Sequence, residues 1–214
     1  RRAIKIASTP PRGPVYVCLP QDILDQPVVE PIRPTSIPST RVRPDDETLK
    51  AAAQLLATAQ KPMIFMGDGI AFSGAQAELT QVAEILGAEV WEADNGELNM
   101  SQAHPLYQGA TGHMFGFQSK PILAKGDVNL VSGTYIVPEV FPELGDVFAP
   151  DAKVIHIDLN GYEIAKNHPV DIGIVSDPKL TLGRLAELLA EVLTPEQKAA
   201  AQKRVTEITN AKQA

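Results

Sequence analysis

The chain has 214 residues, of which 44% are apolar, and a formal net charge of −7. This length allows one or two domains with a sizeable hydrophobic core. Lysine and arginine are dispersed in an acidic chain, and no apolar run approaches the roughly 18 residues of a membrane span; we therefore expect neither nucleic acid nor a membrane as a partner.

The first 44 residues predict a short helix, a short strand and a linker. Ala3, Ile4 and Ala7 have helical spacing, and the apolar run at residues 15–19 is typical of a strand. Cys18, in that run, is expected to be an inert buried thiol, and a single cysteine suits a reducing cytoplasm. An extended linker is indicated by prolines at positions 27, 31, 34, 38 and 44.

The centre of the sequence predicts a βαβ unit. Residues 63–66 form an apolar run expected to be a buried strand, and Gly67-Asp68-Gly69 is expected to be a tight turn. Residues 73–86 then predict a helix that returns to a second strand around Val90. Glycines between a strand and a helix let the backbone approach a phosphate, so the turn is a candidate ligand site.

Capping residues predict where the helices begin and end. Asp45 follows the last linker proline and is placed to N-cap a helix that begins the central domain. Ser73 is the expected N-cap of the next helix, and Gly87 stands where a left-handed residue ends it. Asp177 precedes a further amphipathic helix. The polar tail from Thr194 predicts either a helix or the start of another linker.

The second half of the chain alternates strands with helices. Three further strands are expected at residues 128–131, 153–158 and 172–175. Residues 95–117 are polar and glycine-rich and predict a long loop, followed by a short helix at 120–125. The alternation indicates an α/β protein with a Rossmann-like three-layer α/β/α fold and a parallel sheet of about six strands.

Ligands of such sheets bind outside the carboxyl ends of the strands. The predicted cofactor-binding residues therefore lie at strand ends and in the glycine-rich loop, and Asp158 could accept hydrogen bonds from a ribose. They are Gly67, Asp68, Gly69, Gly112, Gly133, Asp158 and Asp177. The sequence assigns no catalytic residue and no metal ligand.

Other polar residues favour structural explanations. His104 and His113 share a loop but lack a third ligand at metal spacing, which favours a hydrogen-bonded loop over a metal site. Glu92, Asp94 and Glu97 could form an acid–base set, but they are interpreted as a solvated acidic loop.

Five stretches stand out together, at residues 2–22, 61–90, 104–109, 148–158 and 163–167. In order and spacing they resemble thiamine-diphosphate-dependent enzymes such as acetolactate synthase and benzoylformate decarboxylase. The first stretch resembles the end of their N-terminal, pyrimidine-binding domain, and the second resembles the start of their central domain. The third resembles the next loop of that domain, and the last two resemble its later half.

The resemblance implies a division of the chain. Residues 1–24 would be the C-terminal end of the pyrimidine-binding domain and 25–44 a proline-rich linker. Residues 45–193 would be the central domain and 194–214 a linker towards an absent C-terminal domain. The chain begins at Arg1, so we expect an excised piece of a longer cytoplasmic polypeptide. Its partners would be the flanking domains of its own parent chain, within a homo-oligomer, dimer or tetramer.

The resemblance also implies a function for the parent. It would be a lyase or transferase that uses thiamine diphosphate and magnesium to decarboxylate or ligate 2-oxo acids. The catalytic glutamate of the family belongs upstream of Arg1, so we expect this fragment to be inactive alone and to have a structural role. A stand-alone regulatory module that binds FAD or another nucleotide is the alternative.

Gly67-Asp68-Gly69 with Asp94-Asn95 imitates the thiamine diphosphate motif of the family, in which Asp and Asn ligate magnesium. In the family that motif belongs to the C-terminal domain, whereas this copy follows directly on the linker after the N-terminal domain. Coincidence is therefore favoured, and a real thiamine diphosphate site at residues 67–95 stays open as a further alternative.

Central domains of the family differ in their ligand. They hold FAD in acetolactate synthases, an adenosine nucleotide in oxalyl-CoA decarboxylases and nothing in benzoylformate decarboxylases. Flavin-binding relatives have Gly-Met-His-Gly where this chain has Gly112-His-Met-Phe115, and an arginine where Gly133-Thr134-Tyr135 stands. Losing that cation removes a phosphate partner, and Asp68 would repel a phosphate. An empty site is favoured, with FAD and an ADP-like nucleotide as alternatives.

Overall fold

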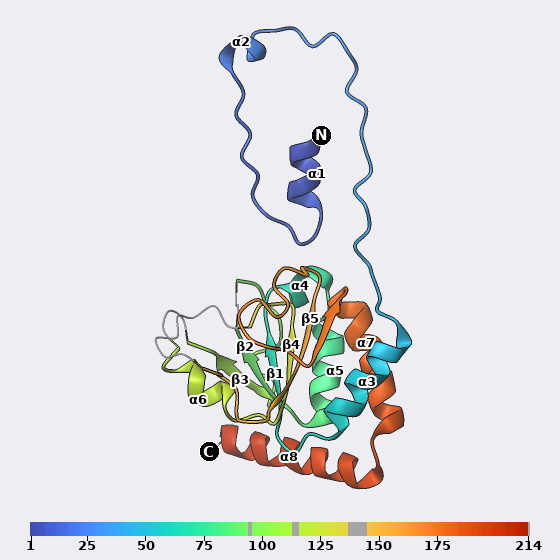
Figure 1. The fold of residues 1–214 in the computed structure, drawn as a ribbon, viewed down its shortest axis with the longest axis vertical. Helices are drawn as coiled ribbons and strands as arrows, with labels where there is room; N and C mark the ends of the chain where they lie inside the picture. The colour runs from blue at the N-terminus through green and yellow to red at the C-terminus, as the bar shows by residue number, and fades with distance from the viewer. Residues whose placement is uncertain (94–95, 113–115, 137–144, 214) are drawn as a thin grey trace. The chain divides into compact units, whose positions relative to one another are not determined.

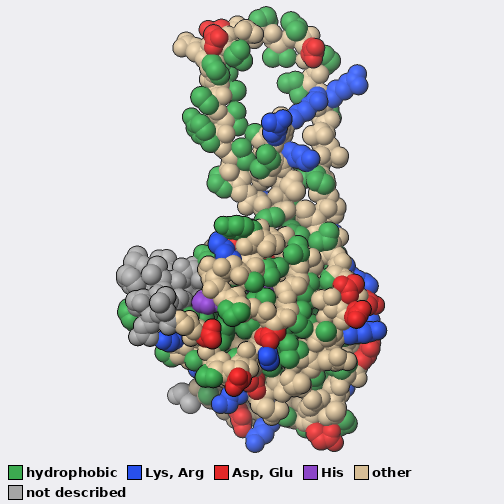
Figure 2. Space-filling model, viewed as in Figure 1, with side chains coloured by type: hydrophobic (Ala, Val, Ile, Leu, Met, Phe, Trp, Pro, Cys, Tyr) green, Lys and Arg blue, Asp and Glu red, His purple; other side chains and the backbone are tan. Residues whose placement is uncertain are grey.

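The structure, a computed structural model, describes residues 1–93, 96–112, 116–136 and 145–213. The chain divides into two compact units, Arg1–Thr40 and Arg41–Ala214. Charges of both signs are mixed over the visible face of the second unit, whereas hydrophobic side chains are exposed along the first (Figure 2).

The first unit has two short helices, α1 (Arg2–Ser8) and α2 (Gln21–Leu24), connected and followed by extended chain (Figure 1). The helix expected near the N-terminus is confirmed. The strand expected at residues 15–19 does not form, and the prediction that Cys18 is buried is wrong, because this thiol is exposed. A lone strand leaves its backbone groups unpaired, and no described strand pairs with this segment.

The second unit is built on a six-stranded sheet in which every pairing is parallel. Its strands are β1 (Pro62–Met66), β2 (Glu89–Glu92), β3 (Tyr107–Ala110), β4 (Val128–Ser132), β5 (Lys153–Asp158) and β6 (Ile172–Val175). Their order is β3-β2-β1-β4-β5-β6, so the chain reverses its direction of travel between β1 and β4. The predicted Rossmann-like α/β fold with about six parallel strands is confirmed.

Helices cover both faces of this sheet (Figure 1). The helices of this unit are α3 (Asp46–Ala57), α4 (Gly69–Ser73), α5 (Gln76–Leu86), α6 (Ser119–Leu123), α7 (Pro178–Val192) and α8 (Pro195–Gln213), of which α8 runs across the amino-terminal ends of the strands (Figure 1). Ile64 and Met66 of β1 belong to the larger core, which includes α3, α5 and α7. Met63 and Phe65 belong to a smaller core with Leu123 of α6. Alternate residues of a fully buried strand thus fill two cores.

Two of the three helix-capping predictions are confirmed. The carboxylate of Asp45 accepts a hydrogen bond from the Thr48 amide at 2.8 Å, and Gly87 ends α5 in the left-handed conformation at φ 60°. The prediction for Ser73 is wrong, because Ser73 is the last residue of α4. The left-handed Gly74 separates α4 from α5 and breaks the single helix that the apolar periodicity suggests.

The long loop expected at residues 95–117 contains a strand, β3, at the edge of the sheet. This strand is irregular: Gly109 has φ 118°, and the pairing with β2 shifts register between Val90 and Trp91. An irregular strand that contains glycine lacks the apolar pattern by which a strand is recognised in a sequence. The short helix expected at 120–125 is confirmed as α6, one or two residues earlier.

The polar tail forms α8, one of the two alternatives expected for it, and α8 belongs to the same compact unit as residues 41–193. Gln197 donates to the Ala57 carbonyl at 2.7 Å, and Arg204 donates to the Leu86 carbonyl through Nε at 3.3 Å and Nη2 at 2.6 Å. Ala57 and Leu86 are the last residues of α3 and α5. Because the last carbonyls of a helix lack partners within it, these donors hold α8 in place.

The far end of α8 is held in the same way. Lys212 Nζ donates to three main-chain carbonyls at 2.7–3.1 Å, those of Gln102 and His104 before β3 and that of Tyr107, the first residue of β3. Of the described α8 side chains only Ala201 is fully buried, and Val205 and Ile208 pack partly buried against the larger core. None of the helices in the described ranges is long and apolar enough to cross a membrane.

Candidate functional site

The carboxyl ends of β1 and β4 meet where the strand order reverses, which is the usual ligand position in an open parallel sheet. The Gly67 amide donates to the Ser132 carbonyl at 3.3 Å, and the Gly69 amide donates to the Gly133 carbonyl at 2.8 Å. Three of the predicted site residues, Gly67, Gly69 and Gly133, are therefore brought together by direct backbone contacts. We call this place the switch point.

The two backbones at the switch point touch so closely that neither has room for a side chain. A Cβ on Gly69 would lie 2.6 Å from Cα and 2.7 Å from the carbonyl oxygen of Gly133. Gly133 itself has φ 69°, and a Cβ there would lie 2.7 Å from the Ile70 amide nitrogen. The close approach that glycine permits is made here to another part of the same main chain.

Asp68, between the two turn glycines, organises the loop that follows β2. Its Oδ1 accepts hydrogen bonds from the Glu97 amide at 2.9 Å and from Asn99 Nδ2 at 3.1 Å. Asn99 Oδ1 in turn accepts from the Ala71 amide of α4 at 3.3 Å. The carboxylate thus ties α4 to residues 97–99. Asp94 and Asn95, which complete the resemblance to the thiamine diphosphate motif, lie outside the described residues.

Asp158, the last residue of β5, lies one strand beyond Gly133, whose amide donates to the neighbouring Ile157 carbonyl at 3.0 Å. Only 9% of Asp158 is exposed, and Oδ1 accepts a hydrogen bond from the Asn160 amide at 2.6 Å. Burial disfavours the charged form and raises the pKa of the carboxyl from 3.8 to about 6. Asp158 is therefore a poorly solvated acid beside the switch point.

We expect Asp158→Asn to be more stable than the unaltered chain at pH 7, by about 1–2 kcal/mol. Because the folded-state pKa of Asp158 is raised, its contribution is most favourable below the unfolded-state pKa of 3.8 and is lost as pH rises through about 6. The advantage of the variant should therefore shrink steadily from pH 7 to pH 4 in urea titrations.

Asp45→Asn is the control with the opposite sign. Hydrogen bonds from Thr48 lower the pKa of the exposed Asp45 carboxyl, so this group stabilises the fold above its unfolded pKa. The control should be no more stable than the unaltered chain at pH 7. An Asp158→Asn advantage that does not change with pH would disprove the buried-acid explanation.

Asp177 has a different environment, at the start of α7. Its side chain accepts a hydrogen bond from the Leu180 amide at 3.1 Å and forms an ion pair with Arg41 at 3.3 Å, while its amide donates to the Val42 carbonyl. This carboxyl is a helix cap that also fixes the chain entering the second unit. The structure places it apart from the switch-point glycines, with its polar contacts made to its own helix and to residues 41 and 42.

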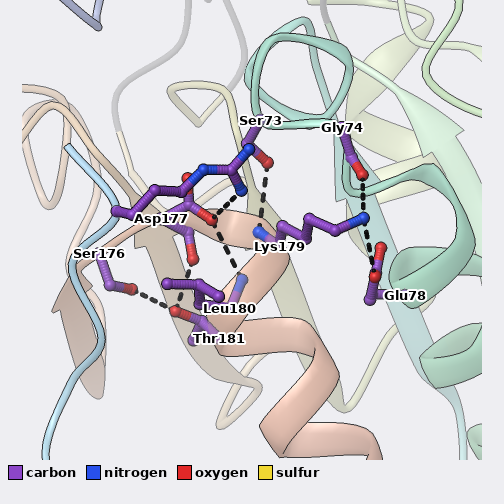
Figure 3. Close-up of polar contacts among 9 residues, drawn as sticks. Ser73, Gly74, Glu78, Ser176, Asp177, Lys179, Leu180 and Thr181 are labelled. Carbon is purple, nitrogen blue, oxygen red and sulfur yellow. Dashed lines mark hydrogen bonds and ion pairs between the residues drawn. The ribbon is translucent and has the colours of Figure 1, made fainter. Parts of the chain in front are cut away.

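Lys179 connects the start of α7 to α4 and α5 (Figure 3). Its Nζ contacts the Gly74 carbonyl at 2.7 Å and Glu78 Oε1 at 2.9 Å, and its amide donates to Ser73 Oγ at 3.2 Å. These contacts explain what Ser73 does in place of capping α5. Lys179, Ser73, Gly74 and Glu78 therefore hold α4, α5 and α7 together through polar contacts with one another.

Gly112, the remaining predicted site residue, follows β3, the edge strand on the opposite side of the switch point from the strand of Asp158, β5. Its amide donates to Ser119 Oγ at 2.7 Å at the start of α6. The residues that follow it in the compared flavin motif, 113–115, lie outside the described part of the chain.

His104 is part of a hydrogen-bonded loop, as expected. Its Nε2 lies 3.3 Å from Glu84 Oε1, and its Nδ1 accepts from the Leu106 amide at 3.2 Å. His113 lies outside the described residues. Within the described ranges no group of three His, Cys, Asp or Glu residues is arranged to hold a metal.

Sequence reasoning missed a polar pair formed by the last residue of β2, Glu92, and the first residue of β3, Tyr107. Tyr107 donates its hydroxyl to Glu92 Oε2 at 2.7 Å, and burial together with this carboxylate raises the pKa of Tyr107 to about 12. Glu92 is 3% exposed, so the solvated-loop interpretation is wrong for it, whereas Glu97 is exposed. The alternating burial of residues 89–92 as a strand could have indicated this.

The carboxyl edge of the sheet is thus acidic at three strand ends. Asp68 follows β1, Glu92 ends β2 and Asp158 ends β5. Carboxylates in a partly desolvated edge repel a phosphate, but they can accept hydrogen bonds from hydroxyl groups such as those of a ribose.

Comparison with known proteins gives consistent matches. The family model described as "Thiamine pyrophosphate enzyme, central domain" matches residues 49–185. The "Probable acetolactate synthase large subunit" of Methanococcus aeolicus is 32% identical over 212 residues, covering 92% of this chain and 34% of that protein. Its namesake in Methanocaldococcus jannaschii is 34% identical over 207 residues, with the same two coverages.

A solved structure agrees with these matches. Benzoylformate decarboxylase from Polynucleobacter necessarius superimposes with a TM-score of 0.70 at 27% identity, covering 86% of this chain and 34% of that one. The chain spans about a third of the length of the curated relatives it matches.

Proposed function

We propose that this chain, which belongs to the thiamine pyrophosphate enzymes through their central domain, is a structural domain of a parent enzyme that acts on 2-oxo acids. The parent is acetolactate synthase-like or benzoylformate decarboxylase-like. We further propose that the parent decarboxylates or ligates its 2-oxo acid substrate, and that this chain supplies no catalytic group.

The observation that supports a structural role is the backbone contact between Gly69 and Gly133. In this proposal the glycines at the switch point are required by packing between β1 and β4, and a bound phosphate is not needed to explain them. Asp68 supports the same interpretation, because its Oδ1 already accepts two N–H groups from the loop that it organises.

Thiamine diphosphate and magnesium would be held by other domains of the parent. At Asp68, Oδ1 already accepts the N–H groups of Glu97 and Asn99, and no group of three His, Cys, Asp or Glu side chains gathers around it within the described ranges. The described residues therefore do not fit a magnesium site at residues 67–95, and we derive no catalytic step there. When bound in the parent, the cofactor supplies the carbanion chemistry of the reaction.

A nucleotide at the switch point is the second candidate function. Two observations favour it: Asp158 could accept hydrogen bonds from a ribose, and Ser132 Oγ is buried without a hydrogen-bond partner in the described part of the chain. The acidic carboxyl edge opposes it, because the phosphates of FAD or an ADP-like nucleotide would meet Asp68 nearby. We therefore favour an empty site.

Residues 1–44 and 195–213 also have proposed roles in the parent. Residues 1–24 end a preceding pyrimidine-binding domain and residues 25–44 form the linker, which agrees with 89% exposure of Tyr16 and 87% exposure of Val29. Exposed apolar side chains of this kind suit burial against a domain of the parent. Residues 195–213 go with the central domain as α8. Homo-oligomer formation and a cytoplasmic location are proposed for the parent.

Titration of the purified full chain with FAD, ADP and magnesium thiamine diphosphate tests the proposal. We expect no saturable binding by calorimetry, no flavin absorbance in the preparation, and no release of carbon dioxide from pyruvate or benzoylformate. Micromolar thiamine diphosphate binding would disprove the assignment of that cofactor to other domains.

A variant separates the nucleotide candidate from non-specific binding. If FAD or ADP binds, Asp158→Asn should weaken that binding at least about tenfold when the ribose hydrogen-bonds to Asp158, whereas Asp45→Asn should leave it unchanged. Such a result would replace the structural role with nucleotide binding.

A further inference from the structure

A cavity of about 400 Å³ opens at the amino-terminal edge of the sheet, at the opposite end of β1 from the switch point. It lies between α8 and the starts of β1 and β2, and the end of α6 forms one side. This volume is within the range of small-molecule sites, roughly 300–1,000 Å³. The cavity is independent of the function proposed above.

The base of the cavity is apolar. The apolar residues of the lining are Met63 of β1, Ile208 of α8, Pro62 and Ala124. Met63 belongs to the smaller core and Ile208 packs against the larger one, so both positions are fixed by the fold. An apolar body of a ligand would therefore meet a preformed surface.

Three cations and two carboxylates line the same cavity, but they are not equally neutralised. Lys125 is paired with Glu89 at 3.2 Å and lies over the Trp91 ring. Glu207 lies 3.7 Å from Lys203 on the exposed side of α8.

Lys61 and Arg204 are the two lining cations that form no ion pair with a carboxylate within the described ranges. The carboxylates of Asp127 and Glu207 still attract the Arg204 guanidinium. Arg204 donates Nε and Nη2 to the Leu86 carbonyl, and Asp127, the nearby acid, accepts the Gln60 and Lys61 amides. Partial burial lowers the pKa of Arg204, although it remains charged at neutral pH.

We propose that this cavity binds a small monocarboxylate with an apolar body. The carboxylate lies between Lys61 and Arg204, and the body lies on Met63 and Ile208. A guanidinium and an ammonium together suit one carboxylate, with which arginine forms charge-assisted hydrogen bonds. A multiply charged phosphate is disfavoured because Glu89 and Glu207 line the same cavity and much of the base is apolar.

Such a ligand would contact α8 and the sheet at once. Because a ligand that contacts both α8 and the sheet binds only when α8 is docked, binding should stabilise the docked position of α8. Slower amide exchange in residues 197–212 is therefore a second measurable consequence.

We would titrate the full chain with 4-methylpentanoate and follow amide resonances by NMR. Saturable shifts are expected around residues 61–63 and 204–208, with a Kd on the order of 1 mM for a ligand of this size. The neutral 4-methylpentanamide and inorganic phosphate should each bind at least about tenfold more weakly. Equal binding of the amide, or tighter binding of phosphate, would disprove the proposed chemistry.

Two variants locate the site. Lys61→Glu reverses the charge of an exposed side chain and Ala124→Phe fills the cavity, and each should weaken binding at least about tenfold. Lys50→Glu makes the same charge change on the exposed face of α3 and should leave binding unchanged. Absence of any saturable shift in the unaltered chain, or equal loss in all three variants, would overturn the proposal.

Discussion

Replacing Gly133 by alanine should cost about 3–5 kcal/mol of unfolding free energy. About 1–2 kcal/mol of this arises because an L-residue is strained at φ 69°. The rest arises because the new Cβ would meet backbone atoms of Gly69 and Ile70 at 2.7–3.0 Å, which cannot rotate away as a side chain could. A loss of this size is a large share of the 5–15 kcal/mol that stabilise a typical domain.

Two further alanine variants separate the two causes. Gly74 has φ 71° with nothing within 4 Å of a Cβ, so Gly74→Ala should lose only about 1–2 kcal/mol from strain. Gly69 makes the same close contact without a left-handed φ, so Gly69→Ala should lose about 2–3 kcal/mol from overlap. Urea titrations of the three variants measure the loss of unfolding free energy in each. A Gly133→Ala loss no larger than that of Gly74→Ala would mean that the backbones at the switch point are not in contact.

Arg204→Met should cost about 2–3 kcal/mol and loosen α8. The methionine keeps an apolar stem but removes both hydrogen bonds to the Leu86 carbonyl, one of the unsatisfied groups at the end of α5. A lost hydrogen bond from a charged donor to a buried carbonyl costs roughly this much. Urea titration measures the loss, and limited proteolysis should cut the tail after shorter exposure to protease.

Arg184→Met provides the matched control on another helix. Arg184 of α7 is paired with Glu187 at 2.7 Å on the surface, and exposed ion pairs contribute only about 0–1 kcal/mol. If the two variants lose equal stability, Arg204 is not an anchor of α8.

Much of the fold could be predicted because its determinants are local. The apolar runs that became β1, β4 and β5 are buried on both faces, so each is recognisable without its neighbours. Asp45 and Gly87 mark helix ends through contacts within a few residues of themselves. The order of several weak motifs was sufficient to indicate the family.

The candidate site was only partly predictable. The principle that ligands lie at strand carboxyl ends selected Gly67, Gly69, Gly133 and Asp158, which the fold places on neighbouring strands. It also selected Asp177, whose carboxyl is used in a cap and in an ion pair with Arg41. It missed the buried Glu92, whose partner Tyr107 belongs to an edge strand that was not predicted from the sequence.

The alternation of strands and helices, the caps and the family can be inferred from the sequence, because these depend on neighbours along the chain. Three features appear only in the folded chain: Gly69 meets Gly133, residues 15–19 have no strand partner within the described chain, and α8 is anchored to the ends of α3 and α5. Each of these depends on backbone groups far apart in sequence, and main-chain carbonyls and amides are the same at every position. No residue pattern along the chain can therefore specify which of them will meet.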